Sequence, residues 1–115
     1  MEKKNMKIAI PTAEGILCSH FGHCEKFAII DVDNGEIKEI NWLTPPPHEP
    51  GVLPRFLKTQ GVDLIIAGGI GWRAQEIFRS FGIEVLVGAP SKDPRELVKE
   101  YIRGALETGR NLCDH

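Results

Sequence analysis

The sequence predicts an α/β fold with one mixed, five-stranded sheet and helices packed on it. Three observations predict this class: strand-like runs joined by a tight turn in the first half, alternating helix and strand patterns after Val52, and short apolar runs that end in glycines. The chain has 115 residues, of which 42% are hydrophobic, which suits one core but hardly two. We therefore predict a single domain over residues 1–115, whose ends, residues 1–5 and 110–115, could be flexible.

A short strand and a long loop are predicted at the start of the chain. The segment MKIAIP, Met6–Pro11, is apolar, and we expect Pro11 to close the strand because proline cannot continue a hydrogen-bonded ladder. The segment Thr12–Glu25 then predicts a long loop.

Two further strands are predicted to form a hairpin. The runs KFAIIDV (Lys26–Val32) and EIKEINW (Glu36–Trp42) flank the turn DNG, in which Asn34 and Gly35 tolerate positive φ. In the second run, apolar residues alternate only imperfectly with charged ones, so we expect this strand at an exposed edge of the sheet. The proline-rich segment LTPPPHEPG predicts an extended, solvated connection to the second half.

Helices and strands alternate in the second half. VLPRFLKTQG predicts a short helix that stops at Gly61. WRAQEIFRSFG predicts a second helix that ends at Gly82, with Trp72 and Phe78 in an apolar set near helical spacing. VDLIIAGG and IEVLVG read as buried strands of the same sheet.

The last helix has the clearest start signal. Asp93 can cap it, Pro94 suits the first helical position and Glu96 completes a capping box. We expect its apolar face to continue until Gly109 ends the helix. The resulting order, βββαβαβα, is an antiparallel meander followed by two βα units, and it predicts the ribonuclease H-like architecture.

Charge and composition argue against several classes of function. The net charge is -2, and the lysines and arginines are scattered among acids without a stripe that would follow a nucleic-acid backbone. The start, MEKKNMKIAI, lacks the apolar segment of a signal peptide, and no stretch approaches the roughly 20 apolar residues of a membrane span. Three cysteines without a secretory signal indicate reduced thiols. We therefore expect a cytoplasmic protein that binds neither nucleic acid nor membrane.

The loop CSHFGHCEKF carries a group of potential metal ligands. Cys18, His20, His23 and Cys24 form the pattern C-x-H-x-x-H-C, and thiolate and imidazole are ligands that zinc and iron prefer. The spacing matches no zinc-finger pattern. In the alternative interpretation, Cys24 packs under the sheet and the histidines are solvated, and the sequence leaves both interpretations open.

The C-terminal tail, NLCDH, carries two more potential ligands. Cys113 and His115 lie two residues apart there. If the tail folds back to the first loop, the combined thiols and imidazoles, with His48 of PPPHEPG as a further contact, would be enough for an ion or a cluster. The alternative is a frayed tail with no part in binding.

A glycine-rich turn, AGGIGWRA, is predicted between a buried strand and a helix. Gly69, Gly71 and Ala74 satisfy the dinucleotide fingerprint G-x-G-x-x-A, but the next strand lacks the acid that a ribose would need. We therefore expect the backbone amides of the turn, with Arg73 beside them, to hold some other anionic group. Close packing of the helix on the strand explains the glycines equally well.

The sequence carries no strong enzyme signature. It contains no G-x-S-x-G, no P-loop and no H-E-x-x-H. Nuclease chemistry, which a ribonuclease H-like order could suggest, needs several carboxylates around two metal ions, and the first strand carries none. We therefore expect no enzymatic activity.

These segments together resemble the dinitrogenase iron-molybdenum cofactor biosynthesis family. The resemblance covers nearly the whole chain and rests on the order and spacing of four stretches: MKIAIPT, SHFGHCEKFAIID, PPPHEPGVLPRFLKTQGVDLIIAGGIGWRAQEIF and GIEVLVGA. The family includes small stand-alone proteins and domains of nitrogenase cofactor carriers and of the cofactor synthase. Its fold is the ribonuclease H-like one.

The resemblance implies binding or carrying of a metal-sulfur cluster or its precursor. The family's S-x-F-G loop falls on Ser19, Phe21 and Gly22, and its proline-histidine loop falls on His48. Its glycine-rich turn falls on Gly68, Gly69, Ile70 and Gly71, followed by Arg73. Cys18, Cys24, Cys113 and His115 look like features of the stand-alone branch, whose members need not serve nitrogenase.

Three hypotheses follow for the function. The first is a non-enzymatic protein that transiently binds an iron-sulfur or molybdenum-containing cluster and exchanges it with cofactor-assembly or acceptor proteins. Three cysteines fall short of a Cys₄ site, so mixed ligation, bridging between two subunits of a homodimer or a preformed cluster would complete it. The second is a regulatory domain that binds a small molecule or anion at the glycine-rich turn. The third is a redox or metal-dependent enzyme.

Overall fold

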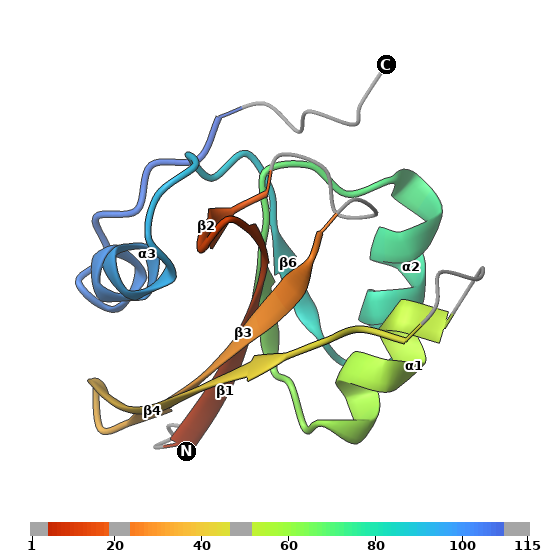
Figure 1. Ribbon diagram of the computed structural model, residues 1–115, viewed down its shortest axis with the longest axis horizontal. Coiled ribbons are helices and arrows are strands. Elements are labelled where there is room, and N and C mark those ends of the chain that lie inside the picture. The colour runs from red at the N-terminus through yellow and green to blue at the C-terminus, as the bar shows by residue number, and fades with distance from the viewer. Residues whose placement is uncertain (1–4, 19–23, 47–51, 110–115) are drawn as a thin grey trace.

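A mixed sheet of six strands forms the centre of the fold (Figure 1). The computed structural model describes residues 5–18, 24–46 and 52–109. The predicted flexible ends lie outside these ranges, except for Asn5, which begins the first strand. The strands are β1 (Asn5–Ala13), β2 (Ile16–Leu17), β3 (Lys26–Asp33), β4 (Glu36–Leu43), β5 (Leu64–Ile66) and β6 (Glu84–Leu86), and the helices are α1 (Val52–Thr59), α2 (Trp72–Ser80) and α3 (Pro94–Ile102).

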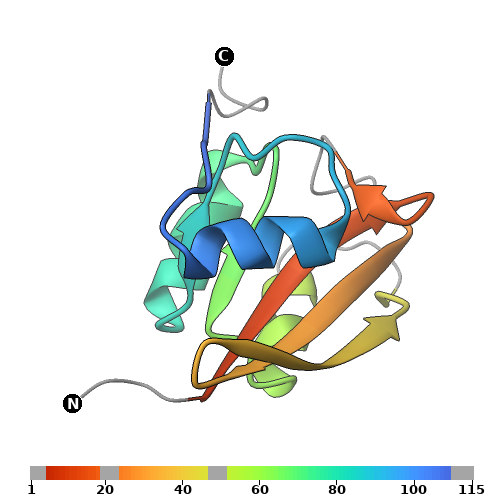
Figure 2. The same cartoon turned by 90° about the vertical axis from the view of Figure 1, so that its left-hand side faces the viewer.

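Helices cover both faces of the sheet. α1 and α2 lie on one face and α3 lies on the other (Figure 1, Figure 2). The core of the α1/α2 face includes Phe27, Ile65 and Phe78, and the core of the α3 face includes Ile66 and Leu97. Because successive strand residues point to opposite faces, Ile65 and Ile66 serve different cores. In the described part of the chain, no helix has the length and apolar character needed to cross a membrane.

The strand directions place several strand ends at one edge of the sheet. The strand order is β4-β3-β1-β5-β6, with β2 paired to β1. β1, β5 and β6 run parallel to one another, and β3 runs antiparallel to both β1 and β4. The carboxyl ends of β1, β4, β5 and β6 therefore lie at the same edge, which we call the carboxyl edge. The predicted α/β class and mixed sheet are confirmed, whereas the ribonuclease H-like label stays a prediction.

The elements with strong local signals are where the sequence predicts them. α3 begins at Pro94, and the carboxylate of Asp93 caps it by accepting a hydrogen bond of 2.8 Å from the amide of Arg95. Asn34 and Gly35 have φ of 52° and 79° in the β3–β4 turn. β4 is an edge strand with an exposed pattern, as expected, and its pairing with β3 contains a bulge.

The sheet has one strand more than the sequence analysis predicts. Glu14 and Gly15 both have positive φ, 55° and 85°, which is the geometry of a two-residue hairpin turn. The chain therefore turns back, and β2 pairs with Thr12 and Ala13 of β1. The prediction of one continuous loop over Thr12–Glu25 was wrong in its first part, because Glu-Gly is a weaker turn signal than Asn-Gly.

Pro11 does not close β1, contrary to the prediction. It lies opposite Phe27, and the pairing with β3 continues to Thr12. The carbonyl of Pro11 accepts a hydrogen bond from the amide of Cys18, on the side of β1 away from β3. The nitrogen of Pro11 faces the same side, so its missing hydrogen breaks no bond to β3.

α3 ends earlier than predicted. Its last residue is Ile102, because Gly104 has a φ of 72° and turns the chain away from the helix axis. The amide of Ala105 donates to the carbonyl of Glu100 at 2.8 Å, which is the long bond of a Schellman motif. The prediction of a helix that continues to Gly109 was therefore wrong, and the residues after Gly104 are free to return along the sheet.

Candidate functional site at the carboxyl edge

The two cysteines that the structure describes flank the end of β1 at the carboxyl edge. The amide of Cys18 donates to the carbonyl of Pro11 at 2.8 Å. On the other side of β1, Glu25 follows Cys24 and donates its amide to the carbonyl of Thr12 at 2.8 Å. Backbone hydrogen bonds therefore fix both flanks of the predicted ligand loop to the same strand end.

Cys24 is half-buried, with its side chain against the core of the α1/α2 face. Burial and, to a smaller extent, the negative charge of Cys18 raise the pKa of the Cys24 thiol from the ordinary 9.0 to about 11, although a hydrogen bond to the Cys24 backbone acts in the opposite direction. The backbone bonds to the carbonyls of Pro11 and Thr12 place both cysteines at the same end of β1. Cys24 thus packs partly beneath the sheet, as one of our two interpretations expects, and still shares a neighbourhood with a second thiol.

The raised pKa leads to a testable prediction about alkylation. We expect Cys24 to react with iodoacetamide at pH 8 about tenfold more slowly than an unfolded cysteine, because a smaller fraction of its thiol is ionised. The higher intrinsic nucleophilicity of a thiolate with a raised pKa offsets only part of this loss. The rate should rise with pH up to about 11, the pKa of the folded thiol. Time-resolved alkylation with peptide mapping measures this rate, and the denatured chain is the control. A rate that levels off near pH 9 in the folded protein would contradict the prediction.

The glycine-rich turn contributes less open surface than the sequence suggests. Gly68, Gly69 and Ile70 are buried, and the Ile70 side chain is part of the core of the α1/α2 face. The carbonyl of Gly68 accepts a hydrogen bond from the amide of Gly88 at 2.9 Å, which extends the pairing of β5 with β6. The first exposed residue of the turn is Gly71, which directly precedes α2. Close packing therefore explains the first part of this turn.

The exposed part of the turn is the N-terminus of α2. Gly71 is the N-cap residue, and no side chain within residues 5–18, 24–46 and 52–109 makes a capping hydrogen bond to this end of the helix. The first turn contains no acidic residue and presents Arg73 to solvent. Helix amides at this position have no acceptor within the helix, so the end carries a partial positive charge that favours anions.

Trp72 is a feature that the sequence analysis missed. Its place in an apolar helical set predicted packing, yet the side chain is 69% exposed. The reason is that Trp72 is the first residue of α2, directly after the turn, whereas Phe78, six residues later, is fully buried. An aromatic residue at the first helical position, directly after an exposed glycine, is the signal that could have indicated this.

The C-terminal segment also reaches the carboxyl edge. The amide of Gly109 donates to the carbonyl of Gly88 at 2.7 Å. The amide of Gly88 in turn donates a hydrogen bond to the carbonyl of Gly68, so the end of the described chain lies beside the glycine-rich turn. The structure therefore places Cys18, Cys24, the N-terminus of α2 and Gly109 at the same edge of the sheet.

Most of the predicted ligands lie outside the described residues. These are Ser19, His20, Phe21, Gly22 and His23 of the first loop, His48 of the proline-rich loop, and Cys113 and His115 of the tail. Within residues 5–18, 24–46 and 52–109, no three cysteine, aspartate or glutamate side chains gather closely enough to hold a metal ion. The ligand set therefore stays a prediction, of which two thiols are placed.

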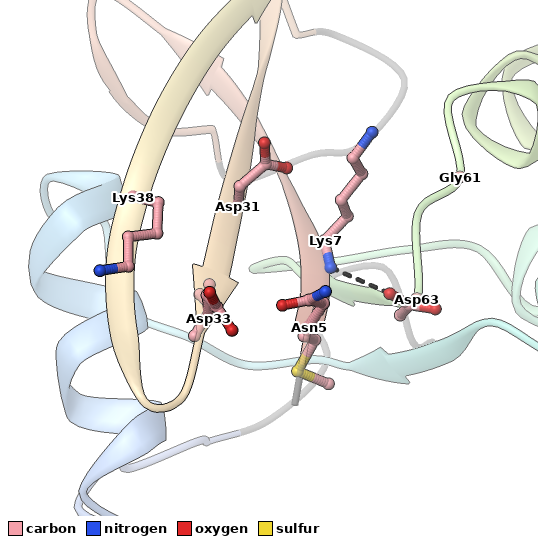
Figure 3. Close-up of a pocket in the computed structure, with 9 residues that line it drawn as sticks. Asn5, Lys7, Asp31, Asp33, Lys38, Gly61 and Asp63 are labelled. Carbon is pink, nitrogen blue, oxygen red and sulfur yellow. Dashed lines mark hydrogen bonds between the residues drawn. The ribbon is translucent and has the colours of Figure 1, made fainter. Parts of the chain in front are cut away.

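A separate cavity of about 410 Å³ lies at the opposite edge of the sheet (Figure 3). Asp31, Asp33 and Asp63 line it together with Lys7 and Lys38. The carboxylate of Asp63 accepts a hydrogen bond of 2.9 Å from the backbone amide of Lys7. Its lining residues include no cysteine and no residue of the carboxyl edge, so this cavity is not part of the cysteine site.

Comparisons with other proteins give the same fold. The uncharacterized protein MJ0580 of Methanocaldococcus jannaschii is 38% identical over 112 residues, which cover 93% of this chain and 94% of that protein. The crystal structure of PH0822 superimposes with a TM-score of 0.84 at 32% identity, over 90% of this chain and 94% of the other. The apo form of the orange protein of Desulfovibrio gigas has a TM-score of 0.73 at 18% identity, over 92% and 94% of the two chains, and shows the fold alone.

A family match covers the described core of the chain. The family described as dinitrogenase iron-molybdenum cofactor matches residues 4–104, and the tail with Cys113 and His115 follows the matched region. The match includes both cysteines of the first loop, the glycine-rich turn and α2. On this match, and on the 38% identity to a full-length relative, the chain belongs to the dinitrogenase iron-molybdenum cofactor family.

Proposed function

We propose that this protein is a cytoplasmic, non-enzymatic carrier that binds an iron-sulfur or molybdenum-containing cluster, or a precursor of one, and exchanges it with cofactor-assembly or acceptor proteins. The observation that carries the proposal is the placement of two cysteines and of the N-terminus of α2 at one edge of the sheet. The family description, which names an iron-molybdenum cofactor, supports the choice of cargo.

The two thiols would supply soft ligands to the cargo. Thiolates bind iron and other thiophilic metals, and Cys18 and Cys24 flank the same end of β1. Two thiols fall short of a full cluster site, so histidines of the first loop, the tail or a second subunit would complete the set. An incomplete set suits a carrier, because the cargo has to leave again.

The N-terminus of α2 would stabilise the charge of the cargo. Clusters with sulfide and thiolate ligands are anionic, and the first-turn amides of α2, together with Arg73, attract negative charge. The same feature also supports the alternative, a regulatory domain that binds a small anion there without any thiol. The two functions differ in whether iron and sulfide are needed for binding.

Anaerobic reconstitution with iron, sulfide and molybdate tests the proposal. We expect bound metal with visible absorption in the unmodified protein. Arg73→Gln should weaken retention about two- to fivefold, the range expected for one exposed charge of roughly 0.5–1 kcal/mol. Arg103→Gln, which removes an exposed charge at the far end of α3, is the matched control and should retain the cluster.

Two results would contradict the carrier proposal. An unmodified protein that takes up no iron after reconstitution would exclude it. Binding of molybdate alone, equally strong without iron and sulfide and sensitive to Arg73→Gln, would favour the anion-binding domain instead.

A further inference from the structure

The cavity at the edge of the sheet opposite the cysteines, which we call the acidic cavity, lies where β1 begins and β3 ends (Figure 3). Its volume of about 410 Å³ falls in the usual range of small-ligand sites, roughly 300–1,000 Å³. Residues of β1, β3, β4 and the loop between α1 and β5 line it. A ligand in this cavity would therefore bind independently of a metal cluster at the carboxyl edge.

Asp31 brings a buried, unpaired oxygen to the wall of the acidic cavity. Its Oδ1 atom is shielded from solvent and has no hydrogen-bond partner among the residues that the structure describes, while the residue as a whole is only partly buried. On the same face of the sheet, its cross-strand neighbours are Lys7 of β1 and Glu39 of β4. The ammonium group of Lys7 donates to the carbonyl of Gln60 at 3.3 Å. Oδ1 thus lacks a donor, which costs free energy that a cation bound to the same carboxylate offsets.

The two lysines of the acidic cavity direct their ammonium groups to other acceptors. A bulge in the pairing of β3 with β4 leaves Lys38 without an opposite residue, and its ammonium group forms an exposed ion pair of 3.1 Å with Glu36. Lys7 donates to a neutral carbonyl. Because the three aspartates and Glu36 outnumber the two lysines, the potential in the cavity favours a cation over an anion.

The three aspartates are spaced for a ligand with several charges. Asp31 and Asp33 lie two residues apart on β3, or about 7 Å, and Asp63 directly precedes β5, two strands from β3, or about 10 Å away. In the part of the chain that the structure describes, no three carboxylate, thiol or imidazole groups gather closely enough to hold a metal ion. Met6 and Val32 also line the cavity and offer apolar surface to a carbon chain between the charges.

We propose that the acidic cavity binds a linear aliphatic polyamine, whose ammonium groups pair with Asp31 and with a second aspartate of the cavity. The ammonium group at Asp31 donates to Oδ2, and its charge stabilises the whole carboxylate, including the buried Oδ1. The methylene groups between the ammonium groups lie along the apolar part of the wall. This binding does not depend on the proposed cluster-carrier function.

Isothermal titration calorimetry with spermidine at low ionic strength tests the proposal. We expect one spermidine to bind per chain, with an affinity that falls at about 0.15 M salt because the charges are partly exposed. The monoamine n-butylamine is the matched control ligand. It pairs with one carboxylate only, so it should bind at least about fivefold more weakly. Absence of spermidine binding, or equal affinity for both amines, overturns the proposal.

Variants of the aspartates test the location of the site. We expect Asp31→Asn to weaken spermidine binding about tenfold, the effect of one hydrogen bond to a charged group. Asp33→Asn should weaken it about two- to fivefold, as expected for a more exposed ion pair. Glu76→Gln is the matched control, because it removes the same charge from the exposed surface of α2 and should change the affinity less than about twofold. Equal losses in Asp31→Asn and Glu76→Gln would show a general attraction of polycations and overturn the proposal.

Thermal unfolding of the ligand-free protein separates a binding role of Asp31 from a structural one. We expect Asp31→Asn to raise Tm by roughly 3 °C, because it removes a charge that has a buried, unpaired oxygen. A lower Tm together with unchanged spermidine affinity overturns the binding role.

Amide NMR shifts locate the ligand in the unmodified protein, without any variant. We expect spermidine to shift the amides of Asn5, Lys7 and Gly61, which line the acidic cavity. Shifts confined to the carboxyl edge overturn the proposed site. Equal shifts of the cavity amides with Mg²⁺ at a lower concentration would indicate a metal site and overturn the choice of ligand.

Discussion

Replacement of Phe78 by alanine is expected to lower the free energy of unfolding by about 3–5 kcal/mol, the range for removal of a fully buried aromatic ring. Phe78 lies in α2 with no exposed surface and belongs to the core of the α1/α2 face. For a chain of 115 residues this corresponds to a drop in Tm of roughly 10–20 °C. Thermal unfolding followed by circular dichroism measures the change.

Trp72→Ala is the matched control for this prediction. It removes a larger aromatic side chain from the same helix, but one that is 69% exposed, so the free energy of unfolding should change by less than about 0.5 kcal/mol. Equal losses in the two variants would mean that Trp72 packs in the core after all. A loss below about 1 kcal/mol for Phe78→Ala would contradict its place in the core.

The two aromatic residues show how far the hydrophobic pattern predicts this fold. Helical spacing predicted that Trp72 and Phe78 both pack in the core, and it correctly predicted a helix in this segment. It could not distinguish the two side chains, because the first residue of a helix faces wherever the preceding turn directs it. The exposure of Trp72 follows from the turn that begins at Gly68, and packing of that turn involves β6.

Local signals predicted the elements that depend on few residues. The Asn34–Gly35 turn and the capped start at Pro94 are confirmed. β2 was missed because the turn that pairs it with β1 is formed by Glu14 and Gly15, a weaker turn signal than Asn-Gly. The end of α3 was missed because an apolar pattern continues past Gly104, while the backbone there adopts a positive φ.

The candidate site shows the same division. The sequence indicated the loop with Cys18 and Cys24, because ligand residues lie close together in it. It did not indicate the hydrogen bond between Gly109 and Gly88, which lie 21 positions apart, because this contact joins two backbones. The sequence shows Gly88 at the end of IEVLVG, but only the fold shows that the backbone of Gly109 lies beside it.

Replacement of Cys24 by alanine is expected to reduce bound metal at least about tenfold, because removal of even an outer-shell partner commonly costs 10–100-fold in affinity. The pKa of about 11 means that the free protein keeps the Cys24 proton at neutral pH. Metal has to displace this proton, so apparent affinity should rise with pH. Between pH 6 and 8, Cd²⁺ affinity of the unmodified protein should gain about one power of ten per pH unit more than that of Cys24→Ala.

A loss of packing at this position has to be separated from the loss of a ligand. Leu43→Ala serves as the control, because its side chain also packs, partly buried, against the core of the α1/α2 face and carries no sulfur. We expect Leu43→Ala to lower Tm and keep the metal, whereas Cys24→Ala should lose the metal and its share of the pH dependence. If the two variants retain metal equally well, Cys24 is a packing residue, and the thiol ligands of a carrier would have to come from Cys18 and the tail alone.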